Sequence, residues 1–343
     1  MKVRTLHFGK AISAALFVLL LSVAGMKNAL AQTLVATLKH GDDISFYYGA
    51  NALVDAHNAA ETGDIITLSS GTFATPDWFS KAITLCGAGC VEDTISGVHP
   101  TVIPGDMIFN VEDTENYLTV EGIYFSQNPK FANLHHPKFV KCNFNSWQFF
   151  SIYDNLDNAQ FVNCVFNSFN FSNTSSTTLI NCVIWNAYNM NNANRSVTAF
   201  NSIFCLTTNY PAALTAYNCI FTKDNNIAIN QYSAMYNCIA IANGYNDNVF
   251  QCANYNCMVV ENYSDVFETF EGDFYYEEPF ILKEEIATSF LGDDGTEVGI
   301  HGGYMPYNSR PSYQIVRHYS VPNKSDNEGH LNVEIEVYTE EGE

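Results

Sequence analysis

The chain has 343 residues, of which 47% are hydrophobic, 14% are aromatic and only 15% are charged. Its 36 acidic residues outnumber its 15 basic residues, so the formal net charge is −21. Nucleic acid and anionic membrane surfaces are therefore poor partners, because both favour clustered Lys and Arg.

The N-terminus has the pattern of a secretory signal peptide. Lys2, Arg4 and Lys10 precede an apolar run that ends at Gly25, and Ala-Leu-Ala comes directly before Gln32. A basic start, an apolar run and an A-x-A site direct export, and a run of about 15 residues is shorter than a membrane span. We therefore expect residues 1–31 to be removed. The mature protein would be extracellular, on the cell surface or periplasmic, without a transmembrane segment.

Residues 32–80 are predicted to form an N-terminal cap and the first strand of the main domain. Asn51 is a suitable N-cap, and small or aliphatic residues from Ala52 to Ala60 lie along one helical face. Gly63 and Gly71 then bracket a short strand. The helix would cover the open end of a β-structure, where an unpaired strand edge invites aggregation.

Residues 81–260 contain a short repeat that predicts the fold. Its units read Val-Asn-Cys-Val-Phe or Tyr-Asn-Cys-Ile-Phe, and successive units lie about 19 residues apart. Such a period is typical of stacked coils, whereas TPR and ankyrin units are longer and helical. We predict an all-β fold, a right-handed parallel β-helix (a solenoid of about nine coils) with an N-terminal capping helix and a C-terminal β-hairpin tail. The central residues of the units are Cys142, Cys164, Cys182, Ser202, Cys219, Cys238 and Cys257.

Each position of the repeat has a physical role. The Asn before the central residue occupies a corner, where Asn tolerates left-handed backbone angles and its amide can bond the Asn of the next coil. Because side chains alternate along a strand, the central residue and the residue two positions later point inward and stack about 4.8 Å apart. The expected asparagine ladder consists of Asn163, Asn181, Asn201, Asn218, Asn237 and Asn256.

The N-terminal stretches resemble those of secreted right-handed β-helix proteins in the pectin-lyase-like superfamily. The resemblance is carried by Ala52–Ala60, Gly63–Phe73 and Lys81–Gly89, and it covers residues 34–260 with a Gly-rich tail segment that ends at Gly303. Exported, mostly uncharacterised bacterial surface proteins are the most similar group. The resemblance implies the fold rather than an activity, because the superfamily contains lyases, hydrolases, adhesins and proteins without chemistry.

Ten cysteines in an exported chain ordinarily suggest disulfides. The six cysteines of the repeat, however, are vertical neighbours with parallel Cα–Cβ bonds, a geometry that strains a disulfide. We expect them to be free, buried thiols that behave as small apolar residues. The repeat leaves the pairing of four others open, namely Cys86, Cys90, Cys205 and Cys252.

The residue after each central position points outward, and in six consecutive coils it is aliphatic. An exposed apolar stripe of this size usually marks a surface that another segment or partner covers. Alternatively, β-branched residues occur there only because they favour strands. The acidic tail, residues 261–343, is the predicted cover, either along the stripe or on the last coil. Alternation at Ile315–Val321 and Leu331–Val337 predicts a hairpin in it. The stripe consists of Val165, Val183, Ile203, Ile220, Ile239 and Met258.

Residues for catalysis are sparse in the repeat. Polysaccharide lyases need a basic residue and a cation, and glycoside hydrolases need clustered carboxylates. The lysines and arginine of the coils form no regular cluster, and the carboxylates of Asp154, Asp157, Asp224 and Asp247 are scattered among coils. No cofactor is predicted. The one candidate for Ca²⁺, Asp293-Asp-Gly-Thr-Glu297, lacks the spacing of a calcium loop and is better explained as a turn.

A noncatalytic protein that binds glycan or polysaccharide is the first functional hypothesis. The alternatives are a polysaccharide lyase or glycoside hydrolase, and an adhesin or structural spacer. Aromatic faces stack on sugar rings and amides bond sugar hydroxyls, although the same residues are also ordinary corner residues. The candidate carbohydrate contacts are Trp147, Tyr153, Trp185, Tyr188, Asn191, Asn192, Arg195, Tyr210, Tyr232 and Tyr245.

Overall fold

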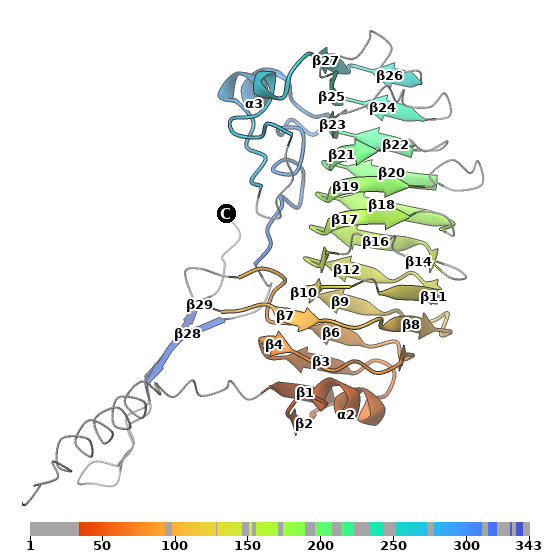
Figure 1. The fold of residues 1–343 in the computed structure, drawn as a ribbon, viewed down its shortest axis with the longest axis vertical. Coiled ribbons are helices and arrows are strands. Elements are labelled where there is room, and N and C mark those ends of the chain that lie inside the picture. Colours follow the sequence, from red (N-terminus) through yellow and green to blue (C-terminus); the bar gives the residue numbers. More distant parts are fainter. Residues whose placement is uncertain are drawn as a thin grey trace, which may run out of the picture. The chain divides into compact units, whose positions relative to one another are not determined.

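The computed structural model describes most of the chain after residue 33. The described residues are 34–92, 98–127, 129–145, 151–152, 156–170, 174–188, 196–207, 214–222, 233–242, 252–272, 278–310, 315–320, 330 and 334–338. Leu34–Glu343 form one compact unit, and the predicted signal peptide lies outside the described residues. Strands dominate the unit (Figure 1), which confirms the predicted all-β class.

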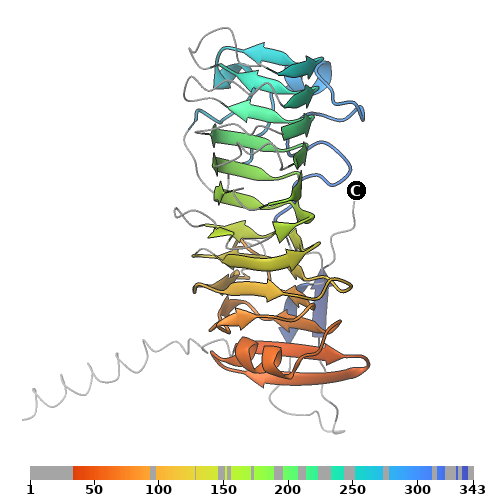
Figure 2. The same ribbon diagram turned by 90° about the vertical axis from the view of Figure 1, so that its right-hand side faces the viewer.

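Parallel strands in three sheets build a β-helix, as the repeat predicts (Figures 1 and 2). The 12-stranded sheet has the order β2 (Asp43–Tyr48), β1 (Val35–His40), β3 (Ile65–Leu68), β6 (Thr84–Cys86), β9 (Thr119–Glu121), β12 (Lys138–Val140), β16 (Ala159–Val162), β18 (Ser176–Ile180), β20 (Ser196–Phe200), β22 (Leu214–Tyr217), β24 (Ala234–Tyr236) and β26 (Ala253–Tyr255).

The second sheet has ten strands and the third has five, among the described residues. The ten-stranded sheet contains β4 (Gly71–Thr72), β7 (Thr101–Ile103), β10 (Ile123–Phe125), β13 (Asn143–Phe144), β17 (Val165–Asn170), β19 (Val183–Tyr188), β21 (Ile203–Thr207), β23 (Ile220–Thr222), β25 (Ile239–Ile241) and β27 (Met258–Val260). The five-stranded sheet contains β5 (Trp78–Phe79), β8 (Ile108–Val111), β11 (Lys130–His135), β14 (Ser151–Ile152) and β15 (Leu156–Asp157).

A hairpin and a helix form the N-terminal cap. Strand β1 pairs antiparallel with both β2 and β3, and helix α2 (Ala52–Ala59) follows β2. Ala52, Leu53 and Ala56 of the helix are buried in the same core as the first coils. The helix therefore covers the first coils, as the sequence predicts, because its small residues share one face.

The corner between the two long sheets has the left-handed backbone that Asn tolerates. The six Asn of the repeat have φ between 44° and 56°. Lys141 and Gly122 occupy the equivalent corner in two earlier coils, with φ of 50° and 65°. Each unit thus turns from one sheet to the next within a single residue, which keeps successive coils in register.

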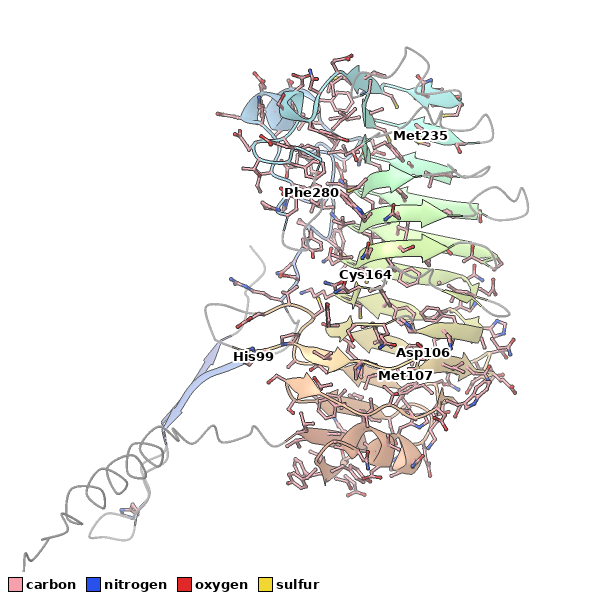
Figure 3. All side chains as sticks on the ribbon, in the orientation of Figure 1. His99, Asp106, Met107, Cys164, Met235 and Phe280 are labelled. Atoms are coloured by element: carbon pink, nitrogen blue, oxygen red, sulfur yellow. The ribbon has the colours of Figure 1, made fainter. Side chains whose placement is uncertain are left out.

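Free cysteines and stacked aromatic rings fill the column. All ten cysteines are unpaired, as the geometry of the repeat predicts for the six that stack. Cys164 lies inside the column (Figure 3), and its Sγ donates to the carbonyl of Val162 at 3.4 Å. Ser202, which replaces cysteine in one coil, makes the equivalent bond to the carbonyl of Phe200 at 2.8 Å. Stacked pairs such as Phe144 and Phe166, with centroids 4.7 Å apart, extend the packing from coil to coil.

The chain after Val260 returns along the outward side of the ten-stranded sheet. It contains the 3-10 helix η1 (Tyr263–Asp265) and helix α3 (Glu284–Ser289). The sequence leaves two positions open for the tail, along the aliphatic stripe or on the last coil. In the structure the tail lies along the stripe. Phe280 (Figure 3) belongs to this outer cluster, which contains Val165, Val183, Trp185, Ile203, Cys205, Ile220, Ile239, Ile241, Tyr263, Val266, Phe267, Phe270, Phe280, Leu282, Val298 and Ile300.

Residues 291–310, here called the strap, cross the Asn corners in reverse order. Asn218 donates to the carboxylate of Asp293 at 2.9 Å, and Asn181 donates to the carbonyls of Ile300 and Gly302 at 2.8 Å each. Longer bonds of 3.4 Å link Asn201 to Glu297 and Asn163 to Pro306. The strap therefore follows four successive coils through their corner amides.

The predicted asparagine ladder is right for the backbone and only partly right for the amides. Beyond the strap, Asn256 donates to Asn237 at 2.6 Å, as expected of a ladder. Beneath the strap, Asn163 and Asn181 donate to the strap carbonyls instead. The carbonyls compete successfully because buried peptide oxygens need a donor.

Two glycines allow the strap to lie this close to the column. A Cβ on Gly302 would lie 2.9 Å from the side-chain amide nitrogen of Asn201 in the column, and only 1.6 Å from the carbonyl oxygen of Glu297 in the strap itself. Gly299 has φ of 81°, and a Cβ there would lie 2.8 Å from the Ile220 side chain. The Gly-rich spacing of this segment therefore has a structural cause. The chain ends with β28 (Ile315–Ser320) and β29 (Glu334–Tyr338), an antiparallel pair that confirms the predicted hairpin.

Candidate binding face

The outward surface of the 12-stranded sheet, here called the outer face, carries side chains in straight rows. Inward residues of these strands, such as Phe139 and Phe161, are fully buried, so their neighbours on each strand point outward. One row aligns a single hydrogen-bonding side chain from each of seven successive coils. This polar row consists of Thr84, Thr119, Lys138, Gln160, Thr178, Thr198 and Thr215.

A second row of the outer face ends in four stacked aromatic rings. Phe200, Tyr217, Tyr236 and Tyr255 form this aromatic ladder, with centroids 4.7–5.2 Å apart and planes within 10° of parallel. The rings cover one another's faces, so their edges and hydroxyl groups are what the surface presents. Tyr255 is the last ring and is 57% exposed.

Further apolar side chains lie at the other end of the outer face. Register places Ile44, Phe46 and Tyr48 of β2 on the same side of the sheet as Lys39, Thr37 and Val35, respectively. All three are exposed, by 56% to 64%. Between the two ends the second row is buried at Val140 and Val162, although Thr67 of this row is exposed. The polar row thus runs along the middle of the face, with aromatic groups at each end.

The outer face carries little charge for a chain with a net charge of −21. The charged residues on its described strands are Lys39, Glu121 and Lys138, judged by strand register. Most of its groups are therefore hydroxyls, an amide and aromatic rings. Such a surface suits a ligand that is polar and uncharged rather than ionic.

The predicted carbohydrate contacts are mostly outside the described residues. Trp185 is described and is only 6% exposed, because the outer cluster under the tail surrounds it. It does not offer a free ring face in this structure. Tyr188 lies in β19. Those outside the described residues are Trp147, Tyr153, Asn191, Asn192, Arg195, Tyr210, Tyr232 and Tyr245.

The aromatic ladder was not among the predicted contacts, although the repeat contains its signal. Its residues come directly before the corner Asn in four successive units, as in Tyr217-Asn218 and Tyr236-Asn237. Register between neighbouring coils turns this spacing into a stack. The same alignment would have identified the polar row, two residues earlier on each strand.

Of the carboxylates considered above, Asp154, Asp224 and Asp247 lie outside the described residues, and the described ones have local partners. Asp293 accepts the Asn218 amide, and Asp294 accepts the backbone N–H and the hydroxyl of Thr296 at 2.9 and 2.7 Å. These bonds make the loop a turn anchored to the column. Asp157 accepts the Ser175 hydroxyl and lies 3.7 Å from His135. Among the described residues, no group of three or more potential metal ligands occurs.

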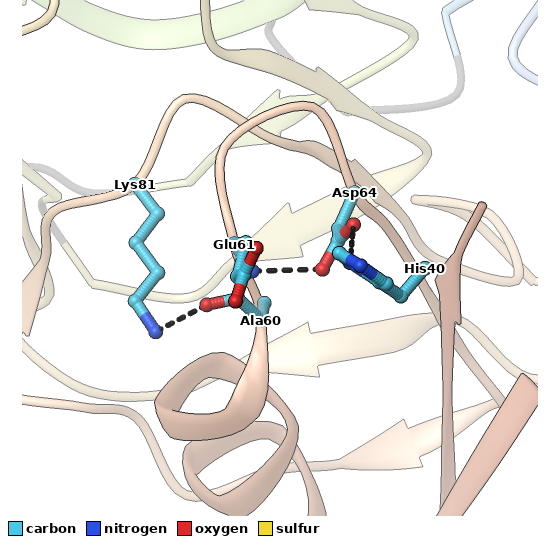
Figure 4. Close-up of polar contacts among 5 residues, drawn as sticks. All are labelled: His40, Ala60, Glu61, Asp64 and Lys81. Atoms are coloured by element: carbon cyan, nitrogen blue, oxygen red, sulfur yellow. Dashed lines mark hydrogen bonds and ion pairs between the residues drawn. The ribbon is translucent and has the colours of Figure 1, made fainter. Parts of the chain in front are cut away.

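A polar network at the cap joins the turn after α2 to the hairpin (Figure 4). His40 Nδ1 lies 2.8 Å from the buried carboxylate of Asp64, whose other oxygen accepts the backbone N–H of Glu61 at 2.7 Å. The bond to Asp64 raises the pKa of His40. Lys81 Nζ donates to the carbonyls of residues 57, 58 and 60, and so closes the C-terminus of α2. This network holds the cap together.

His57 is the other histidine of the cap, and it is buried. Its Nε2 accepts the backbone N–H of Ser80 at 3.3 Å, and its ring packs against Phe79 with centroids 4.5 Å apart. Burial, together with the smaller effect of the nearby charge of Lys81, lowers the pKa of His57 to about 4. A neutral imidazole in contact with core residues serves packing rather than proton transfer.

Comparison of the chain with protein-family models, with curated proteins and with solved structures finds no match. In the part of the chain that is described, no helix is long and apolar enough to cross a membrane.

Proposed function

We propose that this protein is an exported, noncatalytic β-helix protein of the cell surface or periplasm that binds a glycan or polysaccharide along the outer face. The proposal includes membership of the pectin-lyase-like superfamily, which rests on the sequence resemblance together with the parallel β-helix. The observation that carries the function is the polar row, one hydrogen-bonding side chain per coil from Thr84 to Thr215.

The polar row suits a ligand that is itself a repeating chain. Neighbouring strands lie about 4.8 Å apart, so the row offers donors and acceptors at a regular interval. Thr hydroxyls, the Gln160 amide and the Lys138 ammonium group can all bond sugar hydroxyls. Each contact is weak, but contacts made along one polymer act together, because the second and later ones are intramolecular.

The aromatic ladder adds a different kind of contact beside the row. Tyr217 and Tyr236 have stacked ring faces, so they contribute hydroxyl groups and ring edges. Tyr255 is the most exposed of the ladder's rings, at 57%, and its hydroxyl group is open to a ligand. The low charge of the outer face favours neutral polysaccharides over uronates and other acidic ones.

A binding assay with a hydroxyl-deleted polar row tests the proposal. The chain is screened on a glycan array and on insoluble neutral polysaccharides, and then compared with the triple variant Thr178→Val, Thr198→Val, Thr215→Val. Valine keeps the shape of threonine and removes the hydroxyl. We expect the apparent dissociation constant to rise at least about tenfold, which corresponds to about 1.4 kcal/mol spread over three lost hydrogen bonds.

Thr72→Val is the matched control, because Thr72 is an exposed strand residue of the ten-stranded sheet. It should bind as the unmodified chain does. If the unmodified chain binds no polysaccharide, or if the triple variant binds as well as the unmodified chain does, the outer face is not a binding site.

A further inference from the structure

The 12-stranded sheet ends at both sides in a strand with a free edge, in the described part of the chain. Strand β2 is the first strand of this sheet and β26 is the last. We propose that copies of this chain associate head to tail, with β26 of one copy pairing with β2 of the next. The inference is independent of glycan binding, since it concerns the ends of the sheet and not its polar row.

The two free edges run in compatible directions. Strand β2 is antiparallel to β1, and β1 is antiparallel to β3, so β2 runs parallel to β3. Every later pairing of this sheet is parallel, so β26 runs the same way. A second copy with its axis in the same direction would continue the parallel sheet across the joint.

The side chains at the two edges belong to the same rows. Phe46 pairs with Thr37, and Thr37 pairs with Thr67, which begins the row that ends in Tyr255. Phe46 and Tyr255 are each 57% exposed. In a head-to-tail joint, Phe46 of one copy would therefore stack on Tyr255 of the other and extend the aromatic ladder by one ring.

The neighbouring row and the core give the joint two more apolar contacts. Ile44 of β2 belongs to the row that ends in Ala253. Ile44 of one copy would therefore contact Ala253 of the other when Phe46 stacks on Tyr255. Val259 continues the inward row of Ala240 and is 49% exposed, because no described coil follows it. The last coil therefore leaves apolar surface that a further coil, here the cap of the next copy, would cover.

Neither edge strand contains lysine, proline or a bulge, although β26 is only three residues long. Natural edge strands are protected by lysine, proline or bulges. Strand β26 reads Ala-Asn-Tyr, and β2 reads Asp-Ile-Ser-Phe-Tyr-Tyr, with one acidic residue at its start. Because the joint unites two different surfaces, it does not close on itself, and the expected product is a rod that lengthens with concentration.

Sedimentation velocity of the chain from residue 32 onward tests the proposal, with the variants Phe46→Lys and Tyr255→Lys. The unmodified chain should gain mass with concentration, beyond two copies. Each variant has one charged end, which cannot be buried unpaired, so each alone should remain a single copy up to a concentration about tenfold above that at which the unmodified chain associates. Tyr304→Lys is the control, because Tyr304 is 99% exposed on the strap and far in sequence from either edge.

An equal mixture of Phe46→Lys and Tyr255→Lys chains gives the decisive result. The intact Tyr255 end of one variant meets the intact Phe46 end of the other, so the mixture should form particles of two copies. A single-copy unmodified chain at every soluble concentration would overturn the proposal. Association of Phe46→Lys chains alone would do so as well, since it would show a joint between two like ends. Equal circular dichroism and melting temperatures exclude misfolding of the variants.

Discussion

The corner asparagines have two separable roles. At φ near 50° the Asn backbone makes the turn between sheets in six successive units of the repeat. The amide of Asn181 also donates to two strap carbonyls, whereas that of Asn256 bonds only its neighbour in the ladder within the contacts described. The backbone role follows from the sequence, and the strap role depends on which coils the strap crosses.

Replacing Asn181 by glycine separates these roles. Glycine keeps the left-handed corner and removes the amide, so two buried carbonyl bonds are lost while the turn remains. We expect Asn181→Gly to lower the free energy of unfolding by about 1–2 kcal/mol. Asn256→Gly, beyond the strap, should cost less than half as much. Urea unfolding measures both, and equal losses would mean that the strap bonds add nothing.

For single residues, the sequence predicts which side of a strand a side chain lies on, but not which distant segment covers it. The inward position of Cys142 and the outward position of Val165 follow from alternation along a strand, and both are as expected. The sequence predicts Trp185 to be a sugar contact, because aromatic residues near corners often are. The tail covers it, and a contact between residues about a hundred positions apart has no local signal in the sequence.

At the scale of elements, the aliphatic stripe predicts that the tail packs on the column. Six outward aliphatics on consecutive strands require a cover, and an acidic segment outside the repeat is the available one. The sequence left two positions for that segment. In the structure the strap lies on the corner amides. The glycines at 292, 299 and 302 allow the strap backbone to approach the column.

Truncation after Val260 measures what the tail contributes. The change exposes Ile203, Ile220 and Ile239, which are fully buried in the outer cluster. Each buried aliphatic contributes about 1.5–3 kcal/mol, so we expect a melting temperature lower by roughly 10 °C or more, with aggregation. A chain that ends at Arg310 keeps the strap and serves as the control. Unchanged melting and solubility after Val260 would show that the stripe needs no cover.

The aromatic ladder and the polar row are also properties of elements. Each needs the register between strands, which the sequence shows only as a period that varies with the loops. Phe200 and Tyr217 are 17 residues apart, and Tyr217 and Tyr236 are 19 apart, yet both pairs stack. The strands remain aligned because insertions are taken up in the loops.

At the scale of the whole molecule, the column is held together without covalent links between coils. All ten cysteines are free, and burial raises the pKa of the Cys86 thiol to about 11. Backbone pairing, stacked rings and thiol packing repeat in each coil, so stability accumulates along the solenoid rather than at one site.

Thiol labelling checks this absence of disulfides. Under denaturing conditions without reductant, intact mass should show ten alkylated cysteines. In the native protein only the half-exposed thiols of Cys86, Cys252 and Cys257 should react at a measurable rate, because the other seven are buried. Melting temperatures with and without reductant should agree. Fewer than ten labelled cysteines after denaturation would contradict the free-thiol column.

The repeat by itself determined the parallel β-helix, the inward thiols and the left-handed corners. These depend on residues close together in the chain, whose alternation and period leave one way to bury the apolar side. Only the tertiary structure decided the path of the strap, the burial of Trp185 and the alignment of Phe46 with Tyr255. Those depend on which distant residues meet when the coils stack, and no local pattern encodes a meeting between segments so far apart.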